Sequence, residues 1–247
     1  MVTTGCSGAA VWRSPDGRSY AKTASSAAGV GELQDERDRL GWLRTVPVGS
    51  PEVLDWIESD GKCTLITSAL PGVPASEFPA SAVESVTREL VRFLAVLHGI
   101  PVSSCPFDGR LDLTIPRATA NVAAGLVDED DFDDVRRGRA ARDLLDALVA
   151  DQPHARALEA SDLAVCHGDF CLPNVLLDPE TLTVTGILDV GRLGVADRHF
   201  DLALLTRSIA SAELNPSFDS ALADAVIERT GADPWRIEYY RLLDEFF

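Results

Sequence analysis

The sequence predicts an α+β protein with two lobes, because a strand-rich block precedes a helix-rich block. The first 70 residues resemble short strands around one helix, whereas the residues after Pro71-Gly72 follow the period of amphipathic helices. We expect an amino-terminal lobe of residues 1–69 with a small antiparallel sheet and one helix. Residues 70–247 then form a larger, mainly helical lobe, and the two blocks join near residues 68–73. This order argues against an alternating fold with a parallel sheet.

The amino-terminal block contains two expected hairpins and one helix. The turn sequence Ser14-Pro-Asp-Gly17 separates apolar runs at 9–13 and 18–22, and Ser59-Asp-Gly-Lys62 separates runs at 53–57 and 63–67. Asp-Gly pairs between such runs are typical of β-hairpins. Good helix formers at 31–44 predict a helix between the hairpins.

The second block shows helical spacing with a few short strands. Apolar residues from Val83 to Leu97 recur every three or four positions and stop at His98-Gly99, which predicts an amphipathic helix. Leu144, Leu145 and Leu148 mark another helix. Short apolar runs at 163–166, 175–177 and 184–188 predict strands. From residue 197 onward we expect helices, with interruptions at 215–216 and 233–234.

The composition limits the class of protein. Apolar residues make up 46% and charged residues 25% of the 247, and no apolar run is long enough to span a membrane. Residues 1–10 do not resemble a secretory signal, and five scattered cysteines favour reduced thiols in a cytoplasmic protein. With 39 acidic and 22 basic residues the net charge is -17, which disfavours nucleic acid and anionic lipid as partners and attracts cations.

The strongest chemical signal is a loop between two predicted strands. His167-Gly-Asp169 follows one strand, Asn174 comes five residues later, and Asp189 follows the next hairpin at the start of an Asp-x-Gly. Transfer of a phosphoryl group needs a carboxylate beside the attacking hydroxyl and hard oxygen ligands for Mg²⁺. We therefore predict Asp169 as the base and Asn174 and Asp189 as magnesium ligands, with ATP as the phosphoryl donor. An alternative zinc site at Cys166, His167 and Cys171 lacks a Cys-x-x-Cys pair.

The amino-terminal block supplies candidates for the nucleotide. Lys22 ends the second strand of the first hairpin, where it would reach the phosphates, and Glu36 on the following helix would pair with it. Ser7 lies in the small-residue loop Gly5-Cys-Ser-Gly8, whose backbone N–H groups would cradle phosphates. Backbone groups of Ser68 and Leu70, at the join between the blocks, are expected to contact the adenine edge.

These residues resemble the aminoglycoside phosphotransferases, which are similar to small protein kinases, and among them the aminoglycoside 3'-phosphotransferases or kanamycin and neomycin kinases. The resemblance covers nearly the whole chain. It includes Glu32-Leu-Gln-Asp-Glu36, Cys105-Pro-Phe-Asp108 and Gly125-Leu-Val-Asp128, and its narrowest motifs are residues 191–198 and 240–247. It implies a two-lobed protein-kinase-like fold and phosphorylation of the 3'-hydroxyl of these antibiotics, which confers resistance.

The resemblance also implies an acceptor site. Asp201 matches the buried aspartate that braces the catalytic loop. Residues 128–134, here called the acidic segment, match the family's substrate loop, although alone they would be interpreted as a solvated surface. Carboxylates attract and orient the protonated amines of an aminoglycoside. The positions that match the acceptor pocket are Asp131, Asp133, Asp134, Arg192, Arg207, Asp244, Glu245 and Phe247 with its carboxylate.

Three other functions remain open at this point. The streptomycin 3''-kinases share Cys105-Pro-Phe-Asp108 and the Gly-Arg-Leu-Gly run, whereas the Asp-Glu-Phe-Phe terminus favours the 3' enzymes. A kinase for a metabolite with one amine would not need so acidic a pocket. A nucleotide-binding pseudokinase that regulates a partner is disfavoured by the complete catalytic set. We expect a monomer or weak dimer.

Overall fold

The computed structural model describes residues 10–247, which form two compact units of strands and helices. The first unit contains the described residues up to Leu90 together with Leu172–Leu193, and the second contains Val91–Cys171 and Gly194–Phe247. Antiparallel sheets and seven α-helices occur in this part of the chain, so the predicted α+β class is confirmed. The division into lobes after residue 69 stays a prediction.

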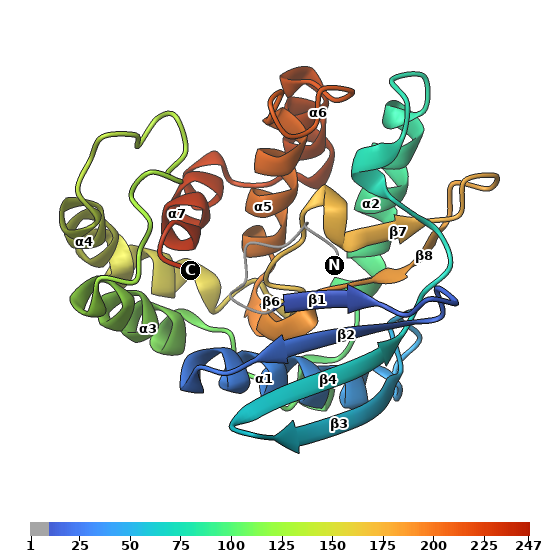
Figure 1. Ribbon diagram of the computed structural model, residues 1–247. Helices are drawn as coiled ribbons and strands as arrows, with labels where there is room; N and C mark the ends of the chain where they lie inside the picture. The colour runs from blue at the N-terminus through green and yellow to red at the C-terminus, as the bar shows by residue number, and fades with distance from the viewer. Residues whose placement is uncertain (1–9) are drawn as a thin grey trace. The chain divides into compact units, whose positions relative to one another are not determined.

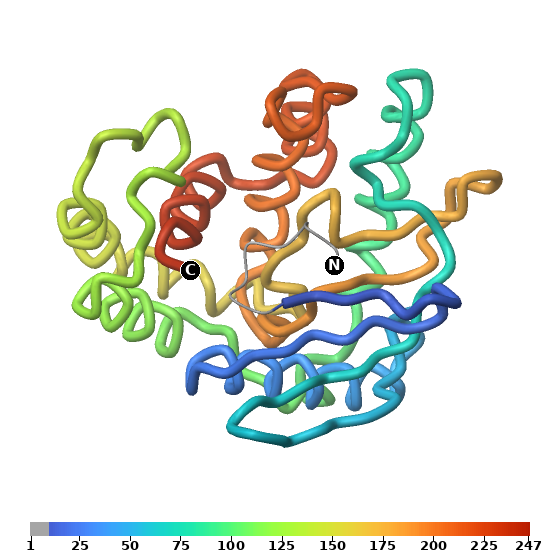
Figure 2. Tube along the Cα trace, in the orientation of Figure 1, coloured from blue at the N-terminus to red at the C-terminus, as the bar shows by residue number. Residues whose placement is uncertain are grey.

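The first unit is built on a four-stranded antiparallel sheet of order β1-β2-β4-β3 (Figure 1). Both expected hairpins are present, and β2 pairs with β4 between them. Figure 2 follows the chain through both hairpins. The strands are β1 (Ala10–Arg13), β2 (Ser19–Ala24), β3 (Val53–Ser59) and β4 (Lys62–Ser68).

Local chemistry explains both turns. Ser14 N–H donates to Ser19 O at 2.9 Å, and Gly17 takes the left-handed conformation with φ 71°. Asp60 and Gly61 both have positive φ, 52° and 73°. Positive φ at both central residues suits the right-handed twist of a two-residue hairpin, which is why Asp-Gly is favoured there.

Helix α1 (Ala27–Leu43) packs against β2, β3 and β4. It begins four residues earlier than the sequence predicts, because the Ser26 hydroxyl accepts the N–H of Gly29 and caps its amino end. Leu33, Leu40 and Leu43 are buried on the side that faces the sheet.

A second, three-stranded sheet of order β5-β7-β8 completes the first unit. Gly49 and Gly186 allow a close contact between the backbone of β8 and the residues near Gly49. The Ile187 N–H donates to Gly49 O at 2.9 Å, and a Cβ at Gly49 would lie 2.0 Å from Thr185 O. The strands are β5 (Val73–Pro74), β7 (Val175–Leu177) and β8 (Val184–Ile187), and the short 3₁₀ turns are η1 (Ala75–Glu77), η3 (Leu172–Asn174) and η4 (Val190–Arg192).

The second unit is mainly helical. Helix α2 (Val83–His98), whose residues up to Leu90 belong to the first unit, follows the predicted amphipathic pattern and ends where His98-Gly99 predicts. The other elements are η2 (Val102–Ser104), α3 (Leu111–Ala124), α4 (Ala141–Glu159), β6 (Leu163–Cys166), β9 (Gly194–Asp197), α5 (His199–Ala210), α6 (Ser220–Thr230) and α7 (Pro234–Asp244). The helix α3 and the strand β9 have no counterpart among the predicted elements.

Helix α5 lies at the centre of this unit (Figure 1), because ten of its twelve residues are buried and it packs against both α6 and α7. Strand β6 pairs antiparallel with β9 directly before α5. The His167-Gly-Asp169 loop follows β6, so its position depends on this core. No helix formed by residues 10–247 is both long and apolar enough to cross a membrane.

Candidate active site and cation-binding cluster

The His167-Gly-Asp loop is held by one buried carboxylate. Asp201, on the first turn of α5, accepts the backbone N–H of His167 and of Gly168, each at 2.9 Å. The Asp169 N–H donates to His167 Nδ1 at 3.1 Å. Gly168 has φ 80°, a conformation that a side chain disfavours. These bonds fix the backbone that presents Asp169, which is partly exposed.

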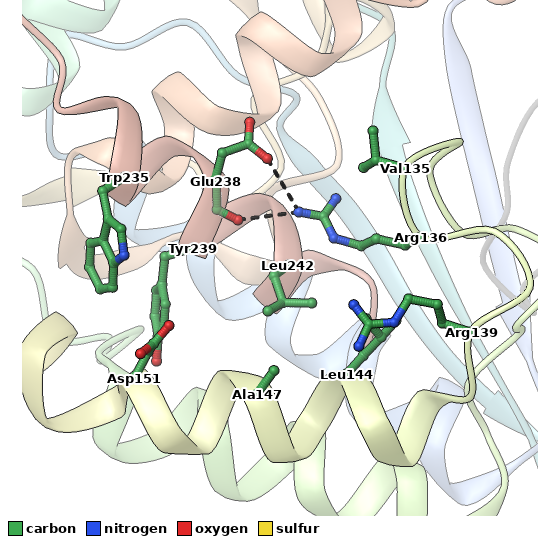
Figure 3. A pocket seen from close by; sticks show the side chains of 10 residues that line it. All are labelled: Val135, Arg136, Arg139, Leu144, Ala147, Asp151, Trp235, Glu238, Tyr239 and Leu242. Carbon is green, nitrogen blue, oxygen red and sulfur yellow. Dashed lines mark hydrogen bonds and ion pairs between the residues drawn. The ribbon is translucent and has the colours of Figure 1, made fainter.

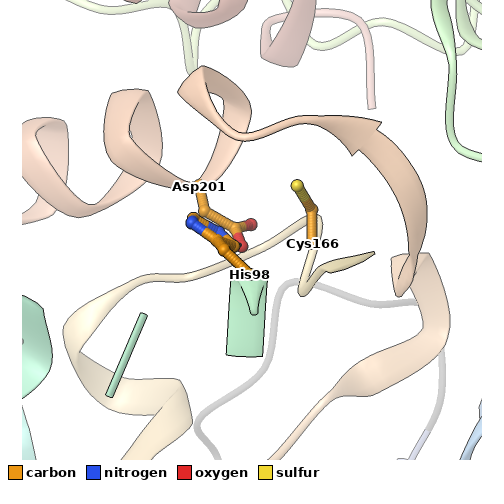
Figure 4. A group of neighbouring side chains, drawn as sticks. All are labelled: His98, Cys166 and Asp201. Atoms are coloured by element: carbon orange, nitrogen blue, oxygen red, sulfur yellow. The ribbon is translucent and has the colours of Figure 1, made fainter. Parts of the chain in front are cut away.

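Two further side chains lie beside Asp201 (Figure 4). His98, the last residue of α2, places Nε2 at 3.0 Å from Asp201 Oδ2. Cys166 Sγ donates to the carbonyl oxygens of Ala196 and Asp197, at 3.7 and 3.5 Å. Complete burial raises the pKa of the Cys166 thiol well above its usual value, so this thiol stays protonated near neutral pH.

The zinc alternative finds little support in this geometry. Within residues 10–247, the cysteine, histidine and acidic side chains that gather closely enough for a metal are His98, Cys166 and Asp201. That group includes only one of the three predicted zinc ligands. The oxygens of its carboxylate already accept two backbone N–H groups, which leaves them less available to a metal.

Lys22, Glu36 and Asp189 form an ion-pair cluster in the first unit. Lys22 Nζ lies 2.8 Å from Glu36 Oε1, 2.9 Å from Oε2 and 2.5 Å from Asp189 Oδ1. Burial opposes the charge on Lys22, but the attraction of Glu36 and Asp189 outweighs it and raises the pKa of Lys22. Burial also raises the pKa of Glu36, against the attraction of Lys22. The predicted Lys22–Glu36 pairing is present, and Asp189 joins it.

The two predicted magnesium ligands flank one hairpin. Asn174 directly precedes β7, and Asp189 comes shortly after β8. The first residue of β7, Val175, pairs with the last residue of β8, Ile187. The Leu188 N–H donates to Asn174 O at 2.8 Å, which closes this end of the hairpin. Asp189 has φ 56°, and its side chain is 49% exposed. Two oxygen-bearing side chains therefore come from the same end of the β7–β8 hairpin.

The expected adenine contacts lie where β4 ends. The Ser68 N–H donates to Glu52 O, and the Ser68 hydroxyl accepts the Glu52 N–H, both at 2.9 Å. The Ser68 N–H is therefore used within the sheet, and a contact with adenine would use another backbone group of Ser68 or Leu70. Ser7 lies outside the described residues.

Carboxylates of the acidic segment and of the carboxyl-terminal residues meet in the second unit. The Asp133 N–H donates to both oxygens of Glu245, at 3.4 and 3.3 Å. Arg136 Nη1 bridges Asp133 Oδ2 at 3.1 Å and Glu245 Oε1 at 3.2 Å. Burial and the Asp133 charge raise the pKa of Glu245 to about 7, although Arg136 opposes the shift.

A second arginine joins the same cluster. Arg207 of α5 forms an ion pair with the buried carboxylate of Asp244 at the end of α7. Burial opposes the charge of Arg207, but Asp244, Asp133 and Glu245 together raise its pKa. The tertiary structure thus brings Asp133, Arg207, Asp244 and Glu245 together, as the resemblance implies.

The four remaining acceptor candidates are Asp131, Asp134, Arg192 and Phe247. Asp131 is exposed, and Asp134 pairs with Arg137 at 2.7 Å while its side chain stays 84% exposed. Phe247 is also exposed, with the Arg117 guanidinium 5.5 Å from the centre of its ring. Arg192 belongs to η4 in the first unit.

Sequence reasoning missed Arg136 and His98 as site residues. Arg136 follows Asp133 by three positions, a spacing at which opposite charges meet in a helical turn. Phe132 is a second missed signal: it is an apolar residue among acids and is 2% exposed, so it anchors the acidic segment. His98 was interpreted only as a helix end.

Comparison with known proteins places these features in context. Residues 2–237 match the profile described as "Phosphotransferase enzyme family". An aminoglycoside 3'-phosphotransferase of Streptomyces fradiae is 42% identical, with 100% of this chain and 94% of that protein covered. A streptomycin 3''-kinase of Streptomyces griseus is 41% identical, with 98% of this chain and 90% of that protein covered.

Solved structures give the same pattern. The crystal structure of an aminoglycoside 3'-phosphotransferase of type VIII superposes with a TM-score of 0.89 at 42% identity, and covers 100% of this chain and 93% of the other. The aminoglycoside phosphotransferase APH(3'')-Id of Streptomyces rimosus, in complex with ADP and streptomycin, has a TM-score of 0.86 at 35% identity. That match covers 98% of this chain and 93% of the other.

Proposed function

Since this chain belongs to the phosphotransferase enzyme family, we propose that it transfers the γ-phosphoryl group of ATP to the 3'-hydroxyl of an aminoglycoside antibiotic and so confers resistance. The observation that carries the transferase assignment is the Lys22–Glu36–Asp189 cluster. A lysine positioned by a glutamate and placed beside a metal-binding aspartate is the arrangement that holds nucleotide phosphates in kinases. The ADP complex of a relative supports ATP as the donor.

In this proposal the nucleotide and its metal ion are bound by the first lobe and by the β7–β8 hairpin, which follows the His167-Gly-Asp169 loop. We assign residues 1–69 to the nucleotide-binding lobe, with Lys22 on the phosphates and Ser68 and Leu70 at the adenine edge. Ser7 belongs to the proposed phosphate loop. Asn174 and Asp189 fit a magnesium ion, because both offer hard oxygen donors. When bound there, the ion would neutralise charge that develops on the phosphates.

Asp169 acts on the acceptor. It accepts a hydrogen bond from the hydroxyl, whose oxygen forms the new P–O bond as the bond to the ADP oxygen breaks, and the hydroxyl proton passes to the carboxylate. In a loose transition state little proton transfer occurs early, so the main task of Asp169 is to orient the hydroxyl. The hydrogen bonds from the loop backbone to Asp201 support this role, since they hold Asp169 in one position.

The acceptor site is assigned to residues 70–247. The cluster of Asp133, Asp244 and Glu245, with Arg207 beside it, supports binding of a cationic and hydroxyl-rich molecule. The net charge of -17 would also attract such a cation at long range. Asp131, Asp134, Arg192 and Phe247 complete the proposed site. No partner beyond these two small molecules is needed, and we propose a monomer or weak dimer.

A streptomycin 3''-kinase is the second candidate, because a relative of that name is 41% identical over nearly the same length. The two candidates share the donor chemistry and differ in the acceptor hydroxyl. The 3' assignment is favoured by the 42% identity to two 3'-phosphotransferases over the whole chain.

One experiment separates these candidates. The protein is incubated with Mg-ATP and each of kanamycin, neomycin, lividomycin, tobramycin and streptomycin, and mass spectrometry of the products detects the gain of one phosphate. We expect kanamycin and neomycin to gain a phosphate, and tobramycin, which lacks the 3'-hydroxyl, to gain none at that ring. Phosphorylation of streptomycin alone would support the 3'' assignment. Tight ATP binding with no transfer to any acceptor would point to the pseudokinase.

A further inference from the structure

Arg136 joins the acidic segment to the end of α7. Its Nη1 atom contacts a carboxylate of each, Asp133 at 3.1 Å and Glu245 at 3.2 Å. Its Nη2 atom contacts Glu238 of α7, at 3.4 Å from the carbonyl oxygen and 3.5 Å from Oε2 (Figure 3). One guanidinium therefore meets three carboxylates that come from two separate parts of the chain.

Arg136 and Glu245 are shielded from bulk water, whereas the side chain of Glu238 is 56% exposed. The side chains of Arg136 and Glu245 are 8% and 3% exposed, whereas that of Asp133 is 29% exposed. Ion pairs interact more strongly where water is excluded, and an unpaired buried charge is costly. Arg136 is thus the closest compensating charge for Asp133 and Glu245, two carboxylates that are proposed to bind the acceptor.

Arg136 also borders a pocket. A pocket of about 310 Å³ lies beside the guanidinium, lined by side chains of α4, of α7 and of the segment that follows the acidic segment. Val135 and Arg139 belong to that segment, and Trp235 and Tyr239 belong to α7. Glu238 holds the guanidinium where the pocket and the carboxylates meet, so Arg136 remains next to the carboxylates.

We propose that Arg136 is a specificity-determining residue whose guanidinium takes the place of one ammonium group of the acceptor. This inference rests on the proposed function. With Arg136 present, Asp133 and Glu245 offer less negative charge than their number suggests. The residue therefore limits how strongly the site prefers an acceptor with an additional amine over one with a hydroxyl at the same position.

A purely structural role predicts a different result. If Arg136 only holds the acidic segment in place, its loss weakens the binding of every acceptor by the same factor, and the preference between two acceptors stays constant. If Arg136 supplies a competing charge, its loss changes the preference itself. The ratio of two dissociation constants separates these roles, because a general loosening of the site cancels in the ratio.

The test is calorimetric titration at about pH 8, above the pKa of about 7 of Glu245, without nucleotide. The two ligands are neomycin and paromomycin, which differ in whether one position carries an amine or a hydroxyl. We expect R136Q to raise the preference for neomycin by about fivefold, the order of one partly screened charge. R136K keeps the charge and should retain the wild-type ratio. R136Q/E245Q removes one charge of each sign and should return the ratio toward the wild-type value.

The control is R139Q, which changes an exposed arginine at the same pocket and should leave the ratio unaltered. Should R136Q fail to fold, R136H permits the same comparison within one protein, because its imidazole is charged near pH 5.5 and neutral near pH 8. At each pH the ratio of the two dissociation constants is compared with that of the wild type. An equal loss of both affinities in R136Q, or an unchanged ratio in R136H at both pH values, would overturn the proposal.

The outcome is separable from that of the proposed function. Binding of both antibiotics without any gain of phosphate would contradict the transferase activity and leave the charge effect of Arg136 measurable. Phosphate transfer by the wild type, together with an unchanged ratio of the two dissociation constants in R136Q, would contradict only the role of Arg136. A wild-type protein that binds neither antibiotic would contradict both.

Discussion

His98 Nε2 lies 3.0 Å from Oδ2 of Asp201, the carboxylate that also accepts the two backbone N–H groups of the catalytic loop. The His98 side chain is 12% exposed and that of Asp201 is fully buried. With the proton on Nε2, the imidazole donates a third hydrogen bond to this carboxylate. The end of α2 is thereby connected through Asp201 to the backbone that carries Asp169.

His98→Ala should lower kcat more than it changes KM for ATP. Removing one partner of a buried charged group costs about 1–3 kcal/mol. We expect this cost to appear in the free energy of activation, so kcat should fall by roughly 5- to 150-fold. Steady-state kinetics with Mg-ATP and kanamycin measures the effect. His154→Ala, at an exposed histidine of α4, is the matched control. A kcat equal to that of the control would mean that His98 does not position the loop.

Asp169→Ala should abolish phosphorylation and leave binding of the antibiotic largely intact. The loop backbone is held by Asp201 and His167 rather than by the Asp169 carboxylate, so we expect the variant to fold. Transfer is followed by mass, and binding by calorimetry. Turnover near the wild-type rate would show that Asp169 is not the residue that orients the hydroxyl.

Glu36→Gln should weaken the use of ATP. The variant keeps the size of the side chain but removes the charge that holds Lys22, which then pairs with Asp189 alone. A hydrogen bond to a charged group contributes about 1.5–3 kcal/mol, so kcat/KM for ATP should fall roughly 10- to 100-fold. Glu32→Gln, one turn earlier on α1 and exposed, is the control. Equal kinetics in the two variants would remove the support for the Lys22–Glu36 pair.

The stability of the protein should carry a pH dependence that comes from Glu245. Its pKa is about 7 in the folded protein, above the usual 4.5, so the folded state binds its proton more tightly than the unfolded chain does. The contribution of Glu245 to the free energy of unfolding is therefore largest below pH 4.5 and decreases as the pH rises through about 7.

Glu245→Gln removes this titration, so its free energy of unfolding should vary less than that of the wild type between about pH 5 and pH 8. Urea denaturation at several pH values in that range measures the slope. Glu228→Gln changes an exposed glutamate of α6 and serves as the control. Parallel curves for the wild type and Glu245→Gln would contradict the raised pKa.

Gly49→Ala should destabilise the first unit. An added Cβ would lie 2.0 Å from Thr185 O, and that oxygen belongs to the backbone of β8 and cannot rotate away. We expect a loss of about 1–3 kcal/mol in the free energy of unfolding, as is typical for overpacking. Gly41→Ala in α1, where a Cβ meets nothing within 4 Å, should instead stabilise the helix by about 0.5–1 kcal/mol. Denaturant unfolding of both variants provides the comparison, and equal stabilities would contradict the steric argument.

Features that depend on neighbouring residues were predictable from the sequence. Asp60-Gly61 forms a hairpin turn because positive φ is a property of these residue types, and α2 ends at His98-Gly99 because its apolar period stops there. The pairing of Lys22 with Glu36 was predicted from the kinase-like motif elsewhere in the chain and from the family resemblance, and the structure contains it. The start of α1 was missed, because its first turn depends on the Ser26 cap rather than on apolar spacing.

By itself the sequence determined the α+β class, the two hairpins, the His-Gly-Asp loop, and the acidic residues of the acidic segment and of the carboxyl-terminal end. Only the tertiary structure decided that Lys22 contacts Asp189, that His98 contacts Asp201, and that Arg136 lies between Asp133 and Glu245. These contacts join residues up to 167 positions apart. Turn and helix preferences act over a few residues, whereas the partner of a buried charge is selected by the packing of whole elements around it.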